Sequence, residues 1–379
     1  MWTFILLMFF TMLFMGVTMG ITPLVSRRST PFGVSVPKQF LKDDFIVRWV
    51  KRYAIINIAI SFFLALPLLL IPFYLEENKV DMVVSLYLII IIFLFMIVSF
   101  LIYLKYRKEL MKWKKTLPID EVSIKKKIVI DSNYHEKLKT TPSGAFVLWQ
   151  LVIIIVTVVI SLMNYDRIPG QIPINFDSNF QANHYIEKSF LTVLSFPLLQ
   201  ILFIPIFYFA HYSFIKSRQK LSPLAPVISS EKSRRYRQAW SKFFFLIAIS
   251  TQLLISSLFL SSVLIDEKYF WIQIIVVALY LLLTIGSTFY LSIKYGQGGE
   301  KLKLSESEDE DSQYYQDPEE DEKWIAGMFY YNPDDAAVFV EKRFGIGTTI
   351  NLARWQGWGF VLGILLLTLI MIIWSFLLE

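Results

Sequence analysis

The 379-residue chain is 55% hydrophobic and 16% aromatic but only 18% charged, and its mean hydropathy is +0.52. A soluble globular protein is about a quarter charged, so this composition excludes an ordinary soluble enzyme. The absence of cysteine excludes disulfide bonds and thiolate catalysis, and three histidines leave little material for a metal site. The formal charge of +6 does not indicate a nucleic-acid partner, because membrane proteins retain Lys and Arg on their cytoplasmic side. We expect a polytopic membrane protein without a cofactor, a metal or a nucleic-acid partner.

Eight apolar runs have the length of about twenty residues that a helix needs to cross a bilayer, and none contains Asp, Glu, Lys or Arg in its core. The runs are 2–25, 54–75, 82–104, 145–165, 189–212, 243–265, 269–293 and 358–378. The first run lacks a basic segment before it and is therefore not a conventional signal peptide. We predict an all-α polytopic membrane protein with about eight transmembrane helices and a small cytoplasmic module between the seventh and the eighth.

The distribution of Lys and Arg predicts the orientation of these helices. Of the 37 basic residues, 33 lie in four of the connecting segments, namely 26–53, 105–144, 213–242 and 294–357. The positive-inside rule places these four segments in the cytoplasm and both termini outside a bacterial cell membrane. The predicted layout is a three-helix region 1–104, a basic loop 105–144, a helix-loop-helix 145–212, a basic loop with two helices 213–293, an acidic linker 294–323, the module 324–357 and a last helix 358–378.

Residues inside the spans give little sign of chemistry. No charged residue lies at membrane depth, and the amides there are typical of packing between helices; they are Asn57, Gln150, Gln200, Gln252 and Gln273. The spans lack the paired acids, Glu–His pairs or Ser–His pairs of intramembrane proteases, and the chain has no Walker A sequence, so we expect no enzymatic activity.

Prolines and glycines in the spans predict local geometry. Four prolines remove backbone donors and predict kinks in the second and fifth spans; they are Pro67, Pro72, Pro197 and Pro205. Such kinks can line a cavity, but they also occur in inert helices. Two pairs of glycines four residues apart predict close helix contacts in the first and last spans, either within one subunit or in a homodimer; the pairs are Gly16 with Gly20 and Gly359 with Gly363.

Charged runs mark the cytoplasmic segments. The basic stretches 105–115, 125–127 and 234–237 either set the topology or bind anionic lipid headgroups. Ten acidic residues between Glu306 and Glu322 predict a disordered linker, because like charges repel one another. An alternative is that this acidic run acts as an electrostatic latch on the basic loops.

The external loop 166–188 is the only one of useful size outside the membrane. Pro169, Gly170 and Pro173 predict a stiff, ordered lid. Its aromatic residues either anchor the loop at the membrane surface or form a patch for an extracellular ligand. The candidate ligand-binding residues are Pro173, Asn175, Phe176, Asp177, Asn183 and Lys188.

This loop resembles that of the bacterial SdpI-like membrane protein family, a domain of unknown function found in immunity and signalling proteins. Pro173, Phe176, Asn183 and Lys188 fall in register with the Pro-x-His-Phe-Asn type loop of that family, and Asp177 takes the place of its Asn. Asn175 replaces the usual His and Phe180 the usual Gly, so a proton- or metal-dependent role of the His is in doubt. The resemblance implies protection against an extracellular agent and recruitment of a cytoplasmic regulator.

The segment 324–357 predicts a second ordered unit, with turns at Tyr330–Asp335 and Gly345–Gly347 and a short amphipathic stretch from Ala336 to Arg343. It resembles a small domain of unknown function that accompanies the loop family in Gram-positive bacterial membrane proteins. We expect Asp334 and Asp335 to cap a helix, and the aromatic residues to lie on the inner membrane surface or to dock a partner. The candidate partner-docking residues are Tyr330, Tyr331, Asn332, Asp334, Asp335 and Arg343.

Three functions remain open from the sequence. The first is an immunity or sensor protein that recognises a hydrophobic or peptide-like extracellular agent with the loop and reports it through the module. The second is a permease or flippase for an uncharged or amphipathic substrate, and the third is a membrane assembly factor. The expected partners are the lipid bilayer, the extracellular agent, a cytoplasmic regulator and a second copy of the chain.

Overall fold

The computed structural model describes residues 2–37, 40–117, 134, 138–176, 182–219, 226–265, 271–304 and 318–378. These residues contain eight helical segments that are long and apolar enough to cross a membrane, so the predicted fold class is confirmed. The helices are α1 (Trp2–Val25), α2 (Asp44–Leu70), α3 (Glu77–Lys114), α5 (Ser143–Met163), α6 (Phe190–Ile201) with α7 (Phe203–Lys216), α8 (Pro226–Leu264), α9 (Trp271–Tyr295) and α11 (Trp355–Leu378).

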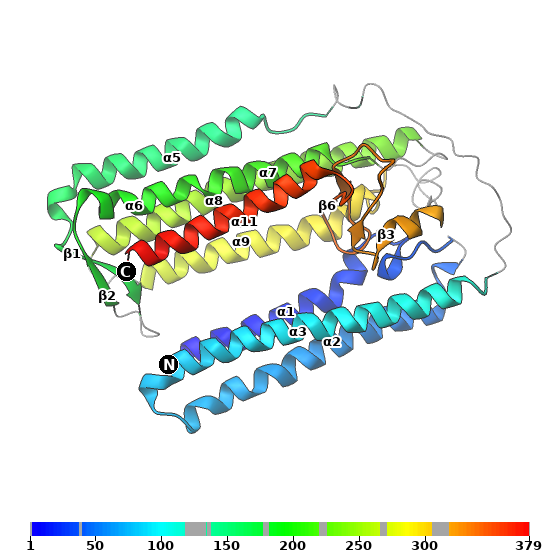
Figure 1. The fold of residues 1–379 in the computed structure, drawn as a ribbon, viewed down its shortest axis with the longest axis horizontal. Coiled ribbons are helices and arrows are strands. Elements are labelled where there is room, and N and C mark those ends of the chain that lie inside the picture. The colour runs from blue at the N-terminus through cyan, green and yellow to red at the C-terminus, as the bar shows by residue number, and fades with distance from the viewer. Residues whose placement is uncertain are drawn as a thin grey trace.

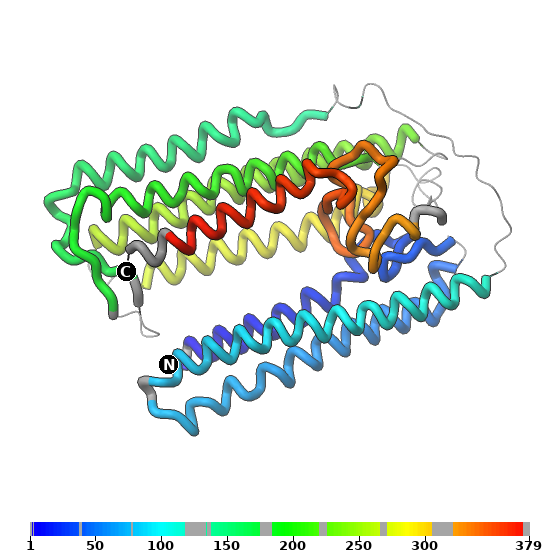
Figure 2. The backbone as a smooth tube through the Cα atoms, in the orientation of Figure 1, coloured from blue at the N-terminus to red at the C-terminus, as the bar shows by residue number. Residues whose placement is uncertain are grey.

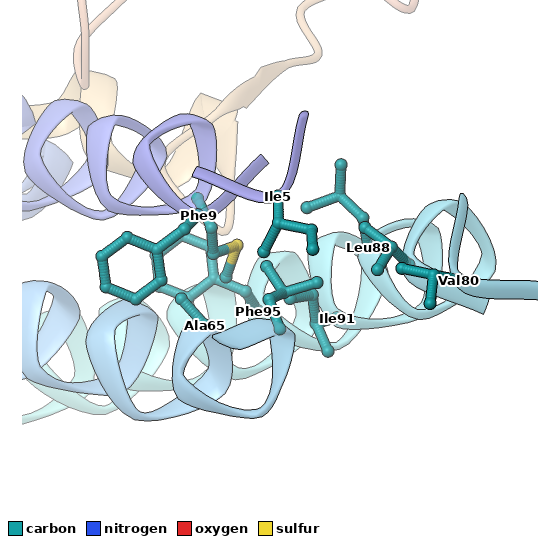
Figure 3. Close-up of a cluster of buried hydrophobic side chains, with 10 residues drawn as sticks. Ile5, Phe9, Ala65, Val80, Leu88, Ile91 and Phe95 are labelled. Carbon is teal, nitrogen blue, oxygen red and sulfur yellow. The ribbon is translucent and has the colours of Figure 1, made fainter. Parts of the chain in front are cut away.

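The helices form two groups, which lie side by side in Figure 1. Helices α1, α2 and α3 make the N-terminal bundle, and helices α5 to α9 with α11 make the C-terminal bundle. The N-terminal bundle has its own apolar core, in which Ile5 and Phe9 of α1 meet Ala65 of α2 and Ile91 and Phe95 of α3 (Figure 3). The N-terminal bundle therefore has an apolar core of its own.

The first pair of glycines brings α1 against α2. A Cβ atom on Gly16 would overlap the Ser61 side chain, and one on Gly20 would lie 3.0 Å from the Ala54 carbonyl oxygen. The predicted close contact of the first span is thus confirmed within the subunit. By contrast, a Cβ atom on Gly359 or Gly363 would meet nothing within 4 Å in the described chain, and a homodimer through α11 stays a prediction.

Several helices extend beyond the predicted spans at their basic ends. Helix α8 begins at Pro226 instead of 243, so most of the predicted basic loop 213–242 is helical. Its first turns are stabilised by Glu231, which pairs with Arg234 and, at 2.6 Å, with Arg235. Hydropathy locates the part of a helix inside the bilayer, whereas backbone hydrogen bonding continues into water.

The prolines change the hydrogen-bond pattern at the predicted places. Helix α2 passes through Pro67 and gives way to the 3-10 helix η3 (Ile71–Phe73), which contains Pro72. The fifth span is interrupted between α6 and α7, where the Leu202 N–H bonds to the Leu199 carbonyl oxygen at 3.1 Å. Pro205 contributes to this interruption because it cannot donate to the carbonyl of Ile201, four residues earlier.

The described chain also contains three two-stranded antiparallel sheets. The first pairs β1 (Gln171–Phe176) with β2 (Ala182–Glu187), the second β3 (Trp324–Ile325) with β4 (Phe329–Tyr330), and the third β5 (Phe339–Glu341) with β6 (Thr348–Ile350). The β1–β2 hairpin and both chain termini lie at one end of the helices, which we call the hairpin end, and β3 to β6 lie at the opposite, module end (Figures 1 and 2).

Candidate functional site

The external loop folds as a hairpin that is fixed to the helices beneath it. Ile168, which precedes the hairpin, and Ile172 of β1 are buried against Val193 of α6 and against Phe259 and Val263 of α8. The described part of the loop is therefore ordered, as predicted, and its order comes from strand pairing and from apolar contact with two helices.

The candidate ligand residues of this loop lie mostly near the tip of the hairpin. Pro173 lies within β1, and the backbones of Asn175, Phe176 and Asn183 lie in the paired strands. Asp177 lies outside the described residues. The hairpin thus brings four of the six predicted residues together, and their role in ligand binding stays a prediction.

Lys188 lies at the base of the hairpin, and its side chain forms hydrogen bonds within the protein. Its Nζ donates to the carbonyl oxygens of Tyr165 (3.0 Å) and Ile168 (2.8 Å) and lies 4.7 Å from the centre of the Tyr165 ring. Its backbone N–H donates to the Gly170 carbonyl oxygen at 2.8 Å. These contacts close the base of the loop, so substitution of Lys188 would disturb the hairpin itself.

Helix α8 joins the hairpin to the opposite end of the molecule. Phe259, near its C-terminal end, packs under the hairpin, and Arg237, 22 residues earlier, contacts the module. At 1.5 Å per residue the two side chains arise about 33 Å apart along one continuous helix. Both functional segments predicted from the sequence therefore rest on the same rigid element.

One carboxylate of the module is bonded to both bundles. Oε2 of Glu341 in β5 lies 2.5 Å from Nη2 of Arg27, which follows α1, and Oε1 lies 3.5 Å from Nη2 of Arg237 in α8. The Glu341 side chain is 8% exposed and that of Arg237 only 1%. Arg237 also donates to the Ile215 carbonyl oxygen at 2.6 Å. Basic residues that predicted topology are thus partners in a buried ion-pair network.

A second carboxylate ties the module to the N-terminal bundle. Asp321 of η7 (Pro318–Lys323) accepts from Ser35 Oγ at 2.6 Å and from Lys114 Nζ at 2.7 Å, and it pairs with Arg343. Burial alone would raise the pKa of Asp321, but the two cations and the Ser35 hydroxyl outweigh burial and hold its pKa below the usual range. Asp321 pairs with basic residues, as expected if the acidic run acts as an electrostatic latch. The part of this run from Glu306 to Asp317 lies outside the described residues.

Backbone carbonyls of the module receive further donors from α3. Tyr103 donates through its hydroxyl to the Ala326 carbonyl oxygen at 3.0 Å, and Arg107 Nη2 donates to the Trp324 carbonyl oxygen at 3.5 Å. Arg107 Nη1 also donates at 2.8 Å to the carbonyl of Gly33 in η1 (Pro31–Gly33), outside the module. Gly327 lies so close to both side chains that a Cβ atom would be 2.5 Å from the Tyr103 hydroxyl, and its φ of +71° also favours glycine. The chain passes closely over α3 because no side chain intervenes at this position.

The module is also bonded to the C-terminal bundle through Arg218 and Gln297. Arg218, after α7, donates to Asp335 Oδ2 at 2.5 Å and through its backbone N–H to the Phe339 carbonyl oxygen at 2.8 Å. Gln297 in η6 (Gln297–Gly299), after α9, exchanges two hydrogen bonds with the Gly347 backbone at 2.8 and 2.9 Å. The module therefore contacts the ends of α3, α7, α8 and α9.

The bundles also touch each other directly at this end. The Arg28 N–H donates to Glu300 Oε1 at 2.8 Å, and Lys301 Nζ donates to the Leu24 carbonyl oxygen at 3.2 Å. Burial raises the pKa of Glu300 to about 7, although Arg27 and Arg28 oppose the shift. The charge of Glu300 at this contact between the bundles therefore changes near neutral pH.

Most of the candidate docking residues are engaged within the protein. Tyr330 and Asn332 are buried and bonded to each other at 3.0 Å, and Asp335 and Arg343 form the ion pairs described above. Only Tyr331 and Asp334 are exposed, so docking of a partner stays a prediction for these two. The expected helix cap is wrong, because Asp335 accepts from Ala337 N–H in a turn that leads into strand β5 instead of a helix. Part of the predicted amphipathic stretch from Ala336 to Arg343 forms this strand.

Amides inside the spans bond across helices, as predicted. Ser99 of α3 donates to Asn57 Oδ1 of α2 at 2.6 Å, and Gln273 of α9 donates to Ser261 of α8 at 2.5 Å. These two amides act as packing contacts.

Comparison with known proteins identifies two short regions. Residues 152–201 match the Domain of unknown function (DUF1648), and residues 333–358 match the Family of unknown function (DUF5808). Neither a curated protein nor a solved structure matches the chain. The first match includes the end of α5, β1, β2 and α6, and the second includes β5, β6 and the start of α11. Both matched regions are described as of unknown function, and the membrane character of the chain comes from its eight long apolar helices.

Proposed function

We propose that this protein is a membrane sensor of the immunity type, in which the hairpin end recognises a hydrophobic or peptide-like agent and the module reports its binding. The observation that carries the proposal is the Glu341 carboxylate, which is bonded to Arg27 of one bundle and to Arg237 of the other. Arg237 belongs to α8, the same helix on which the hairpin rests.

The chemistry of this junction suits the transmission of a small movement. The hairpin packs on Phe259 and Val263, so a ligand that shifts it applies force to α8. A rigid helix carries this displacement to Arg237, whose separation from Glu341 determines the strength of a buried ion pair. Loss of that pair would leave Arg27 alone to hold the carboxylate and would weaken one of the contacts between the module and the C-terminal bundle.

The charge distribution supports the orientation that a sensor of this kind needs. The segments at the module end carry most of the Lys and Arg residues of the chain, which favours the cytoplasm. The hairpin end would then face outward with both termini. In this arrangement Tyr331 and Asp334, exposed on the module, are available to a cytoplasmic regulator.

The test is tolerance of a sensitive Gram-positive host to secreted membrane-active peptides and lipid-targeting antibiotics. We expect the unmodified protein to protect, and Asn175→Ala with Phe176→Ala to abolish protection at unchanged membrane abundance. Gln171→Ala, at the exposed start of the same strand, is the matched control and should protect fully. Lys188 is left intact because it holds the loop closed. No protection by the unmodified protein against any agent would contradict the proposal.

The relay through the module has a separate test in the same assay. Glu341→Gln should reduce protection while the hairpin still binds the agent, whereas Glu322→Gln, at an exposed position of η7, should not. Full protection by Glu341→Gln would show that the junction plays no part in the response.

A second candidate function, a permease for an uncharged or amphipathic substrate, is favoured by one observation, the interruption of the fifth span at Leu202. Interrupted helices at membrane depth are typical of transporter binding sites. Uptake or efflux of a labelled lipid or peptide in proteoliposomes would distinguish this function from sensing.

A further inference from the structure

A cluster of amides and hydroxyls lies inside the C-terminal bundle, beside the interruption of the fifth span. Gln200, near the end of α6, and Gln252 of α8 each donate through Nε2 to the backbone carbonyl oxygen of the other, both at 3.1 Å. Gln252 also donates to Gln150 Oε1 of α5 at 3.1 Å. Ser256 accepts from Gln200 at 2.9 Å and from Thr157 at 2.7 Å.

The cluster lies at membrane depth and is closed to solvent. Gln150 is about 10 Å along α5 from its first residue, at 1.5 Å per residue. Gln200 is 1% exposed and Gln252 0% exposed. A group bound between these residues would therefore be inside the hydrocarbon layer and enclosed by three helices.

Two acceptors in this cluster have no donor within the protein. Oε1 of Gln200 and Oε1 of Gln252 are buried and make no hydrogen bond. The orientation of both amides is defined, because each Nε2 faces a backbone carbonyl, which accepts and cannot donate. A buried amide oxygen without a donor costs about 1–3 kcal/mol, and folded proteins nearly always supply one from the chain or from a bound molecule.

We infer that a small, uncharged hydrogen-bond donor binds in the C-terminal bundle, on the side-chain oxygens of Gln200 and Gln252 beside the interrupted helix. A cation is disfavoured because the five side chains of the cluster carry no negative charge to offset its desolvation. The matching chemistry is an O–H or N–H group. A bound water and a polar group of a hydrophobic agent both supply it. The inference does not depend on the sensor function.

The natural absence of cysteine allows a direct test, since a single introduced thiol is the only one in the chain. Ser256→Cys places it in the cluster, and Ala65→Cys, 0% exposed in the apolar core of the N-terminal bundle, is the control. The full-length protein in liposomes is treated with methyl methanethiosulfonate, which reacts with the thiolate and therefore requires a hydrated thiol. We expect labelling of Ser256→Cys to be at least about tenfold faster than that of Ala65→Cys.

Further variants separate binding from packing. Gln150→Met, Gln200→Met and Gln252→Met, added together to Ser256→Cys, remove both free acceptors and also the Gln150 oxygen that loss of Gln252 would leave without a donor, and should slow labelling to the rate of the control. Gln150→Met alone, added to Ser256→Cys, removes the hydrogen bond between Gln150 and Gln252 but keeps both free acceptors. It should leave the labelling rate of Ser256→Cys within about twofold. Slower labelling in the presence of a protective peptide would identify the peptide as the donor, whereas an unchanged rate would identify water.

Two results would overturn the inference. One is labelling of Ser256→Cys as slow as that of Ala65→Cys. The other does not depend on any variant: an experimental map of the unmodified protein, at a resolution that shows ordered water elsewhere in the bundles, without density within hydrogen-bond distance of Gln200 Oε1 or Gln252 Oε1.

Discussion

Arg237 is almost fully enclosed by protein, although it belongs to a basic stretch that sequence reading assigns to the membrane surface. A buried guanidinium is costly unless its charge is paired. Glu341 supplies the charge, and the Ile215 carbonyl supplies an acceptor. At the residue scale, the stability of the module end therefore depends on a few carboxylates that each serve more than one cation.

The first prediction concerns Glu341→Gln, which removes the negative charge shared by Arg27 and Arg237. Removing one member of a buried ion pair leaves an uncompensated charge and costs about 3–5 kcal/mol. We expect a clear fall in the thermal midpoint of the detergent-solubilised protein, measured by intrinsic fluorescence. Asp334→Asn changes an exposed carboxylate of the same module and should shift the midpoint by less than one degree or so. Equal midpoints for the two variants would contradict the buried pairing.

The second prediction concerns pH and Glu300, whose pKa is raised by burial to about 7. The folded protein holds this proton more tightly than the unfolded chain, so Glu300 lowers stability as the pH rises from about 4.5 to about 7. Glu300→Gln is neutral throughout and can still accept from the Arg28 N–H. The variant should match the unmodified protein near pH 4.5 and become more stable than it at pH 8. Parallel melting curves across this range would disprove the shift.

At the element scale, the hydrophobic pattern was sufficient to place eight spans, because the bilayer demands long, uncharged helices. The strands could not be predicted in the same way. Those of the module are only two or three residues long, and Pro173 hides β1 from any pattern of alternation. The role of Arg27 was equally invisible, since its partner lies 314 residues later in the chain and the same residue also fits a simple topology signal. The sequence predicted an ordered loop but not a hairpin, and the contacts of Lys188 could not be predicted because its acceptors are backbone carbonyls.

The third prediction compares two helices that carry the same glycine spacing. Gly16→Leu would force α1 away from α2, because any Cβ atom at this position meets Ser61, whereas Gly363→Leu meets nothing within the described subunit. We expect the first variant to lose about 2 kcal/mol or more by overpacking and to reach the membrane in lower amounts. The second should keep the stability of the monomer. If Gly363→Leu instead shifts the protein from dimer to monomer in size-exclusion chromatography, the α11 glycines form a homodimer contact.

At the scale of the whole molecule, two bundles with separate packing are joined most extensively at one end. Phe14 of α1 and Phe289 of α9 meet partway along, with ring centres 6.2 Å apart, and the module binds both bundles beyond them. The two bundles are thus joined mainly at the module end. A change in the contacts there should alter the distance between the bundles at the hairpin end.

The fourth prediction measures that separation. Spin labels on Leu7→Cys of α1 and Leu282→Cys of α9, both exposed, report the distance between the bundles in a chain without other thiols. We expect a narrow distance distribution in the otherwise unmodified protein and a broader one after Glu341→Gln or Asp321→Asn. Asp334→Asn should leave the distribution unchanged. A distribution that stays narrow in all three would show that the bundles are held together by contacts other than the module.

The position of the module in the chain also has a consequence for biosynthesis. Arg107 and Arg237 are buried beneath residues that the ribosome adds much later, around Trp324 and Glu341. Until those residues emerge, the cations must remain in water, and the three N-terminal helices must persist as a bundle of their own in the membrane. Chains that end before residue 341 would therefore leave Arg237 at the module end without the carboxylate that pairs with it in the complete chain.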